Sequence, residues 1–303
     1  MKVSDLSTAE LNGLLRRHGL AFNIGPFSVR VKSPFTRIAS GIALLYSDYS
    51  VVPDAPIVDF NIEIRPPNRL RRHFRPQTSF YFDGQNPFKP LPQDQCFAMF
   101  EWGLNWCVAN TAHHYLNIHA AVVEKNGLAV IMPGSPGSGK STLCAALVHH
   151  GWRLLSDEMA LLCTRTGRLT PIPRPVGLKN RSIDIVKKLY EDTTISDPVR
   201  DTAKGTVAHM RPPAASVMAA SEQAVPKVVV FPTYKDNAET VLKPLSKGQA
   251  LLKIADNSFN YNILGVRGFD SLTGMLDQTD GYQLTYHKLD DAILEITRLL
   301  EGV

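Results

Sequence analysis

Residues 134–142, Gly-Ser-Pro-Gly-Ser-Gly-Lys-Ser-Thr, are the feature that most constrains the fold of this chain. They match the pattern G-x-x-x-x-G-K-[ST] without a mismatch. The apolar run at 128–132, followed by Pro133, predicts a buried strand, and residues 141–148 predict a helix with an apolar face. A strand, a glycine-rich loop and a helix in this order are the setting in which the pattern binds phosphate.

The residue types in this loop predict a site for ATP and Mg²⁺. Glycine permits backbone conformations in which consecutive N–H groups point at one anion, and the following helix adds the positive end of its dipole. Lys140 can reach the β- and γ-phosphates, and the Ser141 hydroxyl can ligate Mg²⁺. The predicted nucleotide-binding residues are Gly134, Ser135, Pro136, Gly137, Ser138, Gly139, Lys140, Ser141 and Thr142.

The pair Asp157-Glu158 is the strongest candidate for the acidic groups that such a site needs. It ends a predicted short strand, and only sixteen residues separate Lys140 from Asp157. A strand–loop–helix–strand unit of this length can return the pair to the phosphates. Because adjacent residues on a strand point to opposite faces, the two acids are expected to differ in role.

The first 92 residues read as a small β-rich module. Residues 27–31 and 58–64 alternate apolar and polar side chains, which predicts half-buried strands, and residues 42–46 are a further candidate strand. The proline-rich stretch 86–92 is the expected linker. We therefore place a domain boundary after residue 92.

Residues 93–303 read as the phosphate-loop domain. A helix is predicted at about 93–113, followed by strands at 115–124 and 128–132 that are joined by a hairpin turn. Further along, residues 228–231 predict a buried strand that Pro232 stops.

Composition limits the class of protein. Hydrophobic residues make up 44% and charged residues 20% of the chain, an ordinary globular profile. The chain has no apolar run long enough for a membrane span and does not begin with a signal peptide, so we expect a cytoplasmic protein. The four cysteines form no C-x-x-C pair and are expected to be core residues.

The formal net charge is +5, and much of the positive excess lies in one short segment, which carries Arg65, Arg69, Arg71, Arg72 and Arg75. Three interpretations are open: a solvated basic loop, a surface for an acidic substrate or peptide, and a nucleic-acid site. We favour the solvated loop, because arginines in one loop do not form a stripe along a fold.

Further candidates for the site are a histidine and two basic segments. His119 lies in the strand predicted before the loop, where a lone histidine is more often a core residue than a catalyst. Two turn-rich segments could supply charge to a phosphate or substrate. Their candidate residues are Arg174, Lys179, Lys204, His209 and Arg211.

Three segments together resemble the catalytic domain of HPr kinase/phosphorylase: His119-Ala120-Ala121-Val122, the loop from Gly134 to Ser141, and the run from Gly151 to Glu158. Their order and spacing resemble still more closely the HPr-kinase-related kinases of bacterial biosynthetic clusters, including those that phosphorylate lasso-peptide precursors. The resemblance covers residues 115–235. It implies a phosphate-loop domain related to phosphoenolpyruvate carboxykinases, with a mixed sheet.

The resemblance also implies roles for the site residues. Asp157 would be the base or orienting group for the acceptor hydroxyl, Glu158 would lie near Mg²⁺, and His119 would be the active-site histidine. Glu158 stands where the family usually has aspartate, which lengthens the reach by one methylene. The family's later signature carries a glutamate and Arg-Gly, whereas this chain has Pro173-Arg174-Pro175-Val176-Gly177. This departure argues against HPr as the substrate and against a reverse phosphorylase activity.

We therefore expect an α/β protein with an HPr kinase/phosphoenolpyruvate carboxykinase-like phosphate-loop domain at 93–303 and a β-rich module at 1–92. The expected activity is ATP- and Mg²⁺-dependent phosphorylation of a Ser or Thr hydroxyl in a partner peptide or small protein. A small-molecule kinase and a non-catalytic nucleotide-binding regulator remain as alternatives. We expect neither a membrane nor a nucleic acid as partner, and a homo-oligomer stays open.

Overall fold

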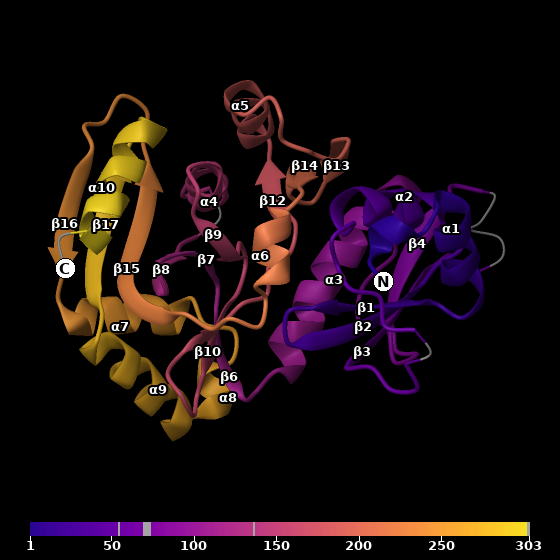
Figure 1. Ribbon diagram of the computed structural model, residues 1–303, viewed down its shortest axis with the longest axis horizontal. Coiled ribbons are helices and arrows are strands. Elements are labelled where there is room, and N and C mark those ends of the chain that lie inside the picture. Colours follow the sequence, from indigo (N-terminus) through magenta and orange to yellow (C-terminus); the bar gives the residue numbers. More distant parts are fainter. Residues whose placement is uncertain (54, 69–73, 136, 302–303) are drawn as a thin grey trace.

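The computed structural model describes residues 1–53, 55–68, 74–135 and 137–301. The protein is mixed α/β with mixed sheets, as expected, and its elements form two lobes (Figure 1). The N-terminal residues, in indigo and purple, make one lobe, and the orange and yellow C-terminal elements make the other.

A five-stranded sheet in the order β1-β2-β3-β4-β5 forms the N-terminal lobe. β2 and β3 are parallel, and the other neighbours are antiparallel. The predicted strands at 27–31 and 58–64 are confirmed as β2 and β3. The elements of this lobe are α1 (Thr8–Arg17), β1 (Leu20–Ile24), β2 (Phe27–Lys32), α2 (Thr36–Leu45), β3 (Phe60–Arg65), β4 (Gln77–Phe82), β5 (Leu91–Pro92) and α3 (Cys96–Thr111).

The strand expected at 42–46 is wrong, because these residues belong mostly to helix α2. Ile38, Ile42 and Leu45 follow one another at helical spacing and are all fully buried. The apolar run therefore marks the buried face of a helix, a distinction that a short run does not reveal by itself.

Helix α3 confirms the prediction at 93–113 and packs closely on the N-terminal sheet. Its residues Phe97, Phe100 and Leu104 share one apolar core with the strands of that sheet. At Gly103 the helix approaches β4 so closely that a Cβ would overlap the ring of Phe80. The domain boundary after residue 92 stays a prediction, and α3, which follows it, packs against the residues that precede it.

A six-stranded mixed sheet in the order β16-β17-β15-β8-β7-β9 forms the C-terminal lobe. β15 is parallel to both β8 and β17, and the remaining pairs are antiparallel. On β8, Val130 and Met132 lie in the apolar core that contains α4, whereas Ala129 and Ile131 lie in the core that contains α7 and α9. Both faces of the sheet are therefore covered, which explains the continuous apolar run before the loop.

Two small antiparallel sheets, β11-β10-β6 and β12-β14-β13, flank this sheet. The strands of the lobe are β6 (Tyr115–Ile118), β7 (Ala120–Lys125), β8 (Leu128–Pro133), β9 (Arg153–Ser156), β10 (Ala160–Cys163), β11 (Leu169–Thr170), β12 (Val176–Lys179), β13 (Val199–Thr202), β14 (Gly205–Met210), β15 (Val225–Tyr234), β16 (Val241–Leu245) and β17 (Asp280–Tyr286). Its helices are α4 (Lys140–His149), α5 (Arg181–Leu189), α6 (Ala214–Met218), α7 (Lys247–Asp256), α8 (Tyr261–Leu264), α9 (Val266–Asp277) and α10 (Leu289–Glu301).

Two strand predictions need correction. The strand expected at 115–124 is two strands, β6 and β7, which belong to different sheets and meet at a bend at His119. Pro232 does not stop β15, which continues to Tyr234. Pairing with β8 ends at Val229, so the missing N–H of Pro232 falls beyond that partner, while pairing with β17 continues.

The structure tests some of the expectations drawn from charge and composition. Arg69, Arg71 and Arg72 of the basic segment lie outside the described residues, whereas Arg65 stacks over Tyr81, 3.8 Å from the ring centroid. All four cysteines are buried and unpaired, as expected. Among the described residues, no helix has the length and apolar character that crossing a membrane would require.

Candidate active site

The glycine-rich loop joins β8 to α4, in the strand–loop–helix order predicted from the sequence. Gly139 has a φ of +89°, in the left-handed region that favours glycine, and a Cβ there would overlap the Tyr286 hydroxyl. The Tyr234 N–H donates a hydrogen bond to the Ser138 carbonyl over 2.9 Å, and the Tyr286 hydroxyl donates to the Gly139 carbonyl over 3.2 Å. β15 and β17 therefore fix the shape of the loop.

A cavity of about 560 Å³ opens over the loop. This volume is in the ordinary range for small-molecule sites, roughly 300–1,000 Å³. Pro136 lies outside the described residues. The other predicted nucleotide-binding residues all line the cavity: Gly134, Ser135, Gly137, Ser138, Gly139, Lys140, Ser141 and Thr142.

Polar atoms without partners are buried at this loop. Lys140 is only 7% exposed, and neither its Nζ nor the Ser138 hydroxyl has a hydrogen-bond partner. Burial lowers the pKa of Lys140, and the nearby carboxylates Glu158 and Asp157 oppose that shift. A buried polar group without a partner is costly, so these atoms indicate that the cavity is built for an anion.

Asp157 follows β9 and is held against the loop. Its Oδ2 accepts hydrogen bonds from the Ser141 hydroxyl over 3.1 Å and from the Gly177 N–H over 3.0 Å. Its other oxygen, Oδ1, is buried without a partner. Burial raises the pKa of Asp157 to about 6, with a further contribution from the negative charge of Glu158. The carboxylate therefore lies where a cation would stabilise it.

Glu158 pairs with His119 instead of the loop. The distance between His119 Nε2 and Glu158 Oε2 is 3.1 Å. Burial alone would raise the pKa of Glu158, but the hydrogen bond with His119 and the charge of Lys140 outweigh it, so the pKa lies below its ordinary value. His119 is held by its backbone N–H, which donates to the Asn257 carbonyl over 2.7 Å. The bend between β6 and β7 thus brings the predicted histidine to the acidic pair.

The oxygen atoms of Ser141 and Asp157 fit a magnesium ion that a nucleotide helps to hold. Mg²⁺ prefers oxygen ligands and is commonly bound by one or two carboxylates together with phosphate oxygens. Within the described residues, no group of three or more His, Cys, Asp or Glu side chains could hold a metal ion alone. A cation at this place would therefore need oxygens from the nucleotide or water.

Of the five predicted basic residues, Lys179 and Arg174 differ from each other in their surroundings. Lys179, on β12, lines the loop cavity. Arg174 is buried, and its Nη2 lies 2.5 Å from Glu101 Oε2 while its Nη1 donates to Asn105 Oδ1 over 2.6 Å. Both partners belong to α3. The positive charge of Arg174 is thus balanced inside the protein.

The other three predicted basic residues lie around β14. His209 is buried with its ring 5.8 Å from that of Phe97, and burial lowers its pKa. The Lys204 ammonium lies 5.0 Å from the ring centroid of Trp102. Arg211 Nη2 pairs with Asp48 Oδ2 at 2.5 Å.

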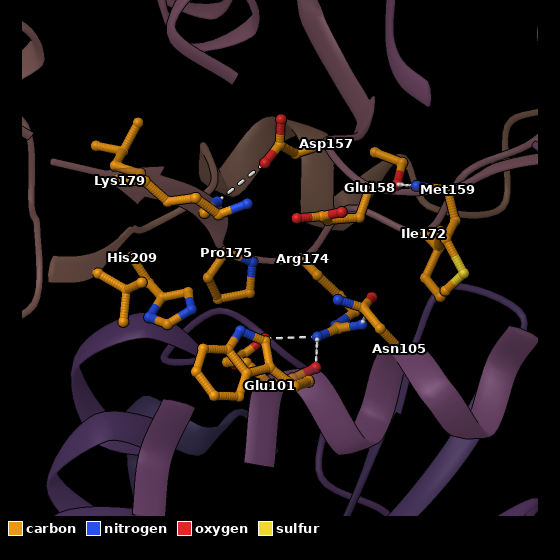
Figure 2. A pocket seen from close by; sticks show the side chains of 15 residues that line it. Glu101, Asn105, Asp157, Glu158, Met159, Ile172, Arg174, Pro175, Lys179 and His209 are labelled. Carbon is orange, nitrogen blue, oxygen red and sulfur yellow. Dashed lines mark hydrogen bonds and ion pairs between the residues drawn. The ribbon is translucent and has the colours of Figure 1, made fainter. Parts of the chain in front are cut away.

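A second, smaller cavity of about 30 Å³ lies on the α3 side of the acidic pair. Figure 2 shows Asp157, Glu158 and Lys179 on one wall and Glu101 and Asn105 of α3 on the opposite wall. The two cavities share Glu158, Gly177 and Lys179 as lining residues. The acidic pair therefore lies where the cavities meet.

The sequence predicted the helix at about 93–113, but none of its residues was named as part of the site, so the contribution of α3 was missed. Trp102 is half-buried and lines the second cavity together with Glu101 and Asn105. One signal was available in the sequence. Glu101 is the one charged residue between Cys96 and Thr111, and a lone acid in an apolar helix needs a partner.

Comparisons with known proteins give three partial matches. Residues 91–179 match a family described as SynChlorMet cassette protein ScmC. A putative HPr kinase/phosphorylase from Fusobacterium nucleatum subsp. nucleatum is 30% identical over 79 residues, which is 24% of this chain and 13% of that protein. The chain thus spans only a small part of this curated relative. The structure of the Hpr(Ser) kinase/phosphatase from Coxiella burnetii aligns with 61% of this chain and 94% of that one, at 12% identity and a TM-score of 0.29.

Proposed function

We propose that this protein is a kinase that transfers the γ-phosphoryl group of ATP to the hydroxyl of a Ser or Thr in a peptide or small protein. The observation that carries the proposal is the buried Lys140 ammonium, unpaired in a cavity beside two carboxylates. A nucleotide phosphate would satisfy this ammonium, and a cation would satisfy Asp157. The resemblance to an HPr kinase/phosphorylase over 79 residues supports phosphoryl transfer as the reaction.

We assign the two acids opposite roles from those that the family resemblance implies. Asp157 would hold Mg²⁺ together with Ser141, because their side chains already lie 3.1 Å apart beside the loop. Glu158 would orient the acceptor hydroxyl, because it lines both cavities and is bonded to His119. His119 would keep the Glu158 carboxylate in place and ionised.

Catalysis would rest on positioning and on charge. The amides of the glycine loop and Lys140 would hold the phosphates, and Lys179 would add positive charge near the transferred group. Bound Mg²⁺ would neutralise negative charge on the phosphate oxygens. Glu158 would accept the hydroxyl proton as the new oxygen–phosphorus bond forms.

The test is incubation with Mg²⁺ and ATP labelled on the γ-phosphate, together with small proteins and peptides encoded near this gene. The matched family is described as a cassette protein, which is the reason for choosing neighbours. We expect label on a peptide with the wild-type protein and none with Lys140→Ala. Label on a small metabolite instead would indicate a small-molecule kinase, and ATP that is bound but stays intact would indicate a regulator.

A further inference from the structure

The smaller cavity has the size of one side-chain head group. A water molecule needs roughly 10–15 Å³ of such space, so about 30 Å³ admits two non-hydrogen atoms. The hydroxymethyl group of serine contains two such atoms. A sugar ring has more non-hydrogen atoms than this space admits. The loop cavity is much larger, at about 560 Å³. The larger cavity therefore suits a nucleotide, and the smaller one suits a single side chain.

The walls of this cavity suit an uncharged hydroxyl. Arg174 and Glu101 neutralise each other, and His209 is held toward its neutral form by burial. Met159 and Ile172 add apolar surface. The Asp157 and Glu158 carboxylates also line the cavity, and Glu158, which borders the loop cavity as well, is placed to receive a hydrogen bond from the incoming group.

Trp102 gives the cavity a surface that reaches outside the protein. It is half-buried, so the residue keeps some contact with solvent, and the Lys204 ammonium lies 5.0 Å from the centroid of its ring. A peptide that places one side chain in the cavity would pass across this residue with its neighbouring backbone. Tryptophan is among the side chains that contribute most to recognition at such positions.

We propose that the α3-side cavity is the acceptor subsite, that it admits a Ser side chain of a peptide segment, and that Trp102 contacts this segment and helps to select it. The proposal rests on the kinase function proposed above and names where its acceptor binds. The acceptor hydroxyl passes its proton to the Glu158 carboxylate, its oxygen bonds to the γ-phosphorus of ATP, the bond from that phosphorus to the β,γ-bridging oxygen breaks, and ADP leaves.

The experiment uses the full chain, Mg²⁺ and ATP labelled on the γ-phosphate, with two sets of acceptors. One set is a peptide library with Ser fixed at the centre and all other positions degenerate, next to a library with Ala at the centre. The second set is free L-serine and glycerol. The variants are Trp102→Ala, Trp102→Phe and, as a matched control on the exposed end of α3, Asn110→Ala. ATP affinity and ATP hydrolysis by water are measured for every variant.

We expect the wild-type protein to label the Ser library but not the Ala library, free serine or glycerol. Trp102→Ala should raise the apparent KM for the peptides about tenfold or more. Its ATP affinity and water hydrolysis should stay within about twofold of wild type, because Trp102 does not line the loop cavity. Trp102→Phe should restore most of the peptide affinity, and Asn110→Ala should behave as wild type.

Four results would overturn the proposal, and they differ from failure of the kinase function. Label on free serine or glycerol would contradict the peptide subsite but not the nucleotide site. The same holds if the wild-type protein binds ATP but labels no peptide. An unchanged peptide KM in Trp102→Ala would remove Trp102 from recognition. Equal loss of ATP binding and peptide labelling in Trp102→Ala would show a structural role. If the wild-type protein binds no ATP, the kinase function fails together with the subsite.

Discussion

Asp157 and Glu158 are adjacent and both carry a carboxylate, but their environments differ. Asp157 is 3% exposed and accepts hydrogen bonds from Ser141 and Gly177. Glu158 is half-buried and paired with His119. Two acids in different surroundings acquire different tasks, because burial and neighbouring charges set the protonation of each one.

Conservative amide variants should separate the two acids. We expect Asp157→Asn to raise the Mg²⁺ concentration needed for half-maximal ATP binding about tenfold, because one anionic ligand is lost. Glu158→Gln should leave this concentration nearly unchanged and lower phosphoryl transfer by about 10²-fold or more, in the range for loss of a general base. Calorimetric titrations with ATP at several Mg²⁺ concentrations measure the first effect. The opposite pattern would restore the roles that the family resemblance implies.

At the scale of elements, the packing of α3 on the N-terminal sheet positions one wall of the site. The contact is close at Gly103, where the helix backbone meets Phe80. Because Phe80 is fully buried, its ring has little room to move away. The place of Trp102 relative to Glu158 therefore depends on a glycine that follows it directly in the helix.

A pair of glycine substitutions tests this packing. Gly103→Ala should lower the free energy of unfolding by about 1–3 kcal/mol, because its methyl group would overlap the Phe80 ring. Gly13→Ala in α1 is the matched control, since nothing lies within 4 Å of the added Cβ. It should raise the free energy of unfolding by up to about 1 kcal/mol, through helix propensity. Urea unfolding curves measure both, and equal effects would mean that α3 does not pack as described.

At the scale of the whole molecule, a buried polar network joins the two lobes. The Tyr46 hydroxyl donates to Glu101 Oε1 over 2.6 Å, and Glu101 pairs with Arg174. Tyr49 donates its hydroxyl to the Pro173 carbonyl over 2.5 Å. The residues that follow α2, together with helix α3, thereby hold the segment that leads to Gly177 and Lys179.

Removing one member of this network should lower the stability of the fold strongly. Glu101→Ala leaves Arg174 buried without its anionic partner, so we expect the free energy of unfolding to fall by about 3–5 kcal/mol. Arg298→Ala is the control, because Arg298 forms an exposed pair with Glu295, and its loss should cost less than about 1 kcal/mol. Thermal unfolding followed by circular dichroism measures the difference. Similar losses for both variants would mean that the buried pair does not join the lobes.

The sequence predicted the parts of the site that are local in the chain. The loop at 134–142, the strand before it and the acids after it lie within 31 residues, so spacing alone brings them together. The sequence could not predict that Arg174 would be neutralised by Glu101, because 73 positions separate them and only the packing of α3 unites them. The bend at His119 was also missed, since apolar residues on both sides read as one strand.

The most direct measurement is calorimetric titration of ATP, with and without Mg²⁺, into the wild-type protein and into Lys140→Ala. It tests the central claim that the loop cavity is built for a nucleotide and its cation. We expect wild-type binding that Mg²⁺ strengthens and a loss of about tenfold or more in Lys140→Ala, from one charge-assisted hydrogen bond. Absence of binding, or equal affinity in the folded variant, would contradict the claim.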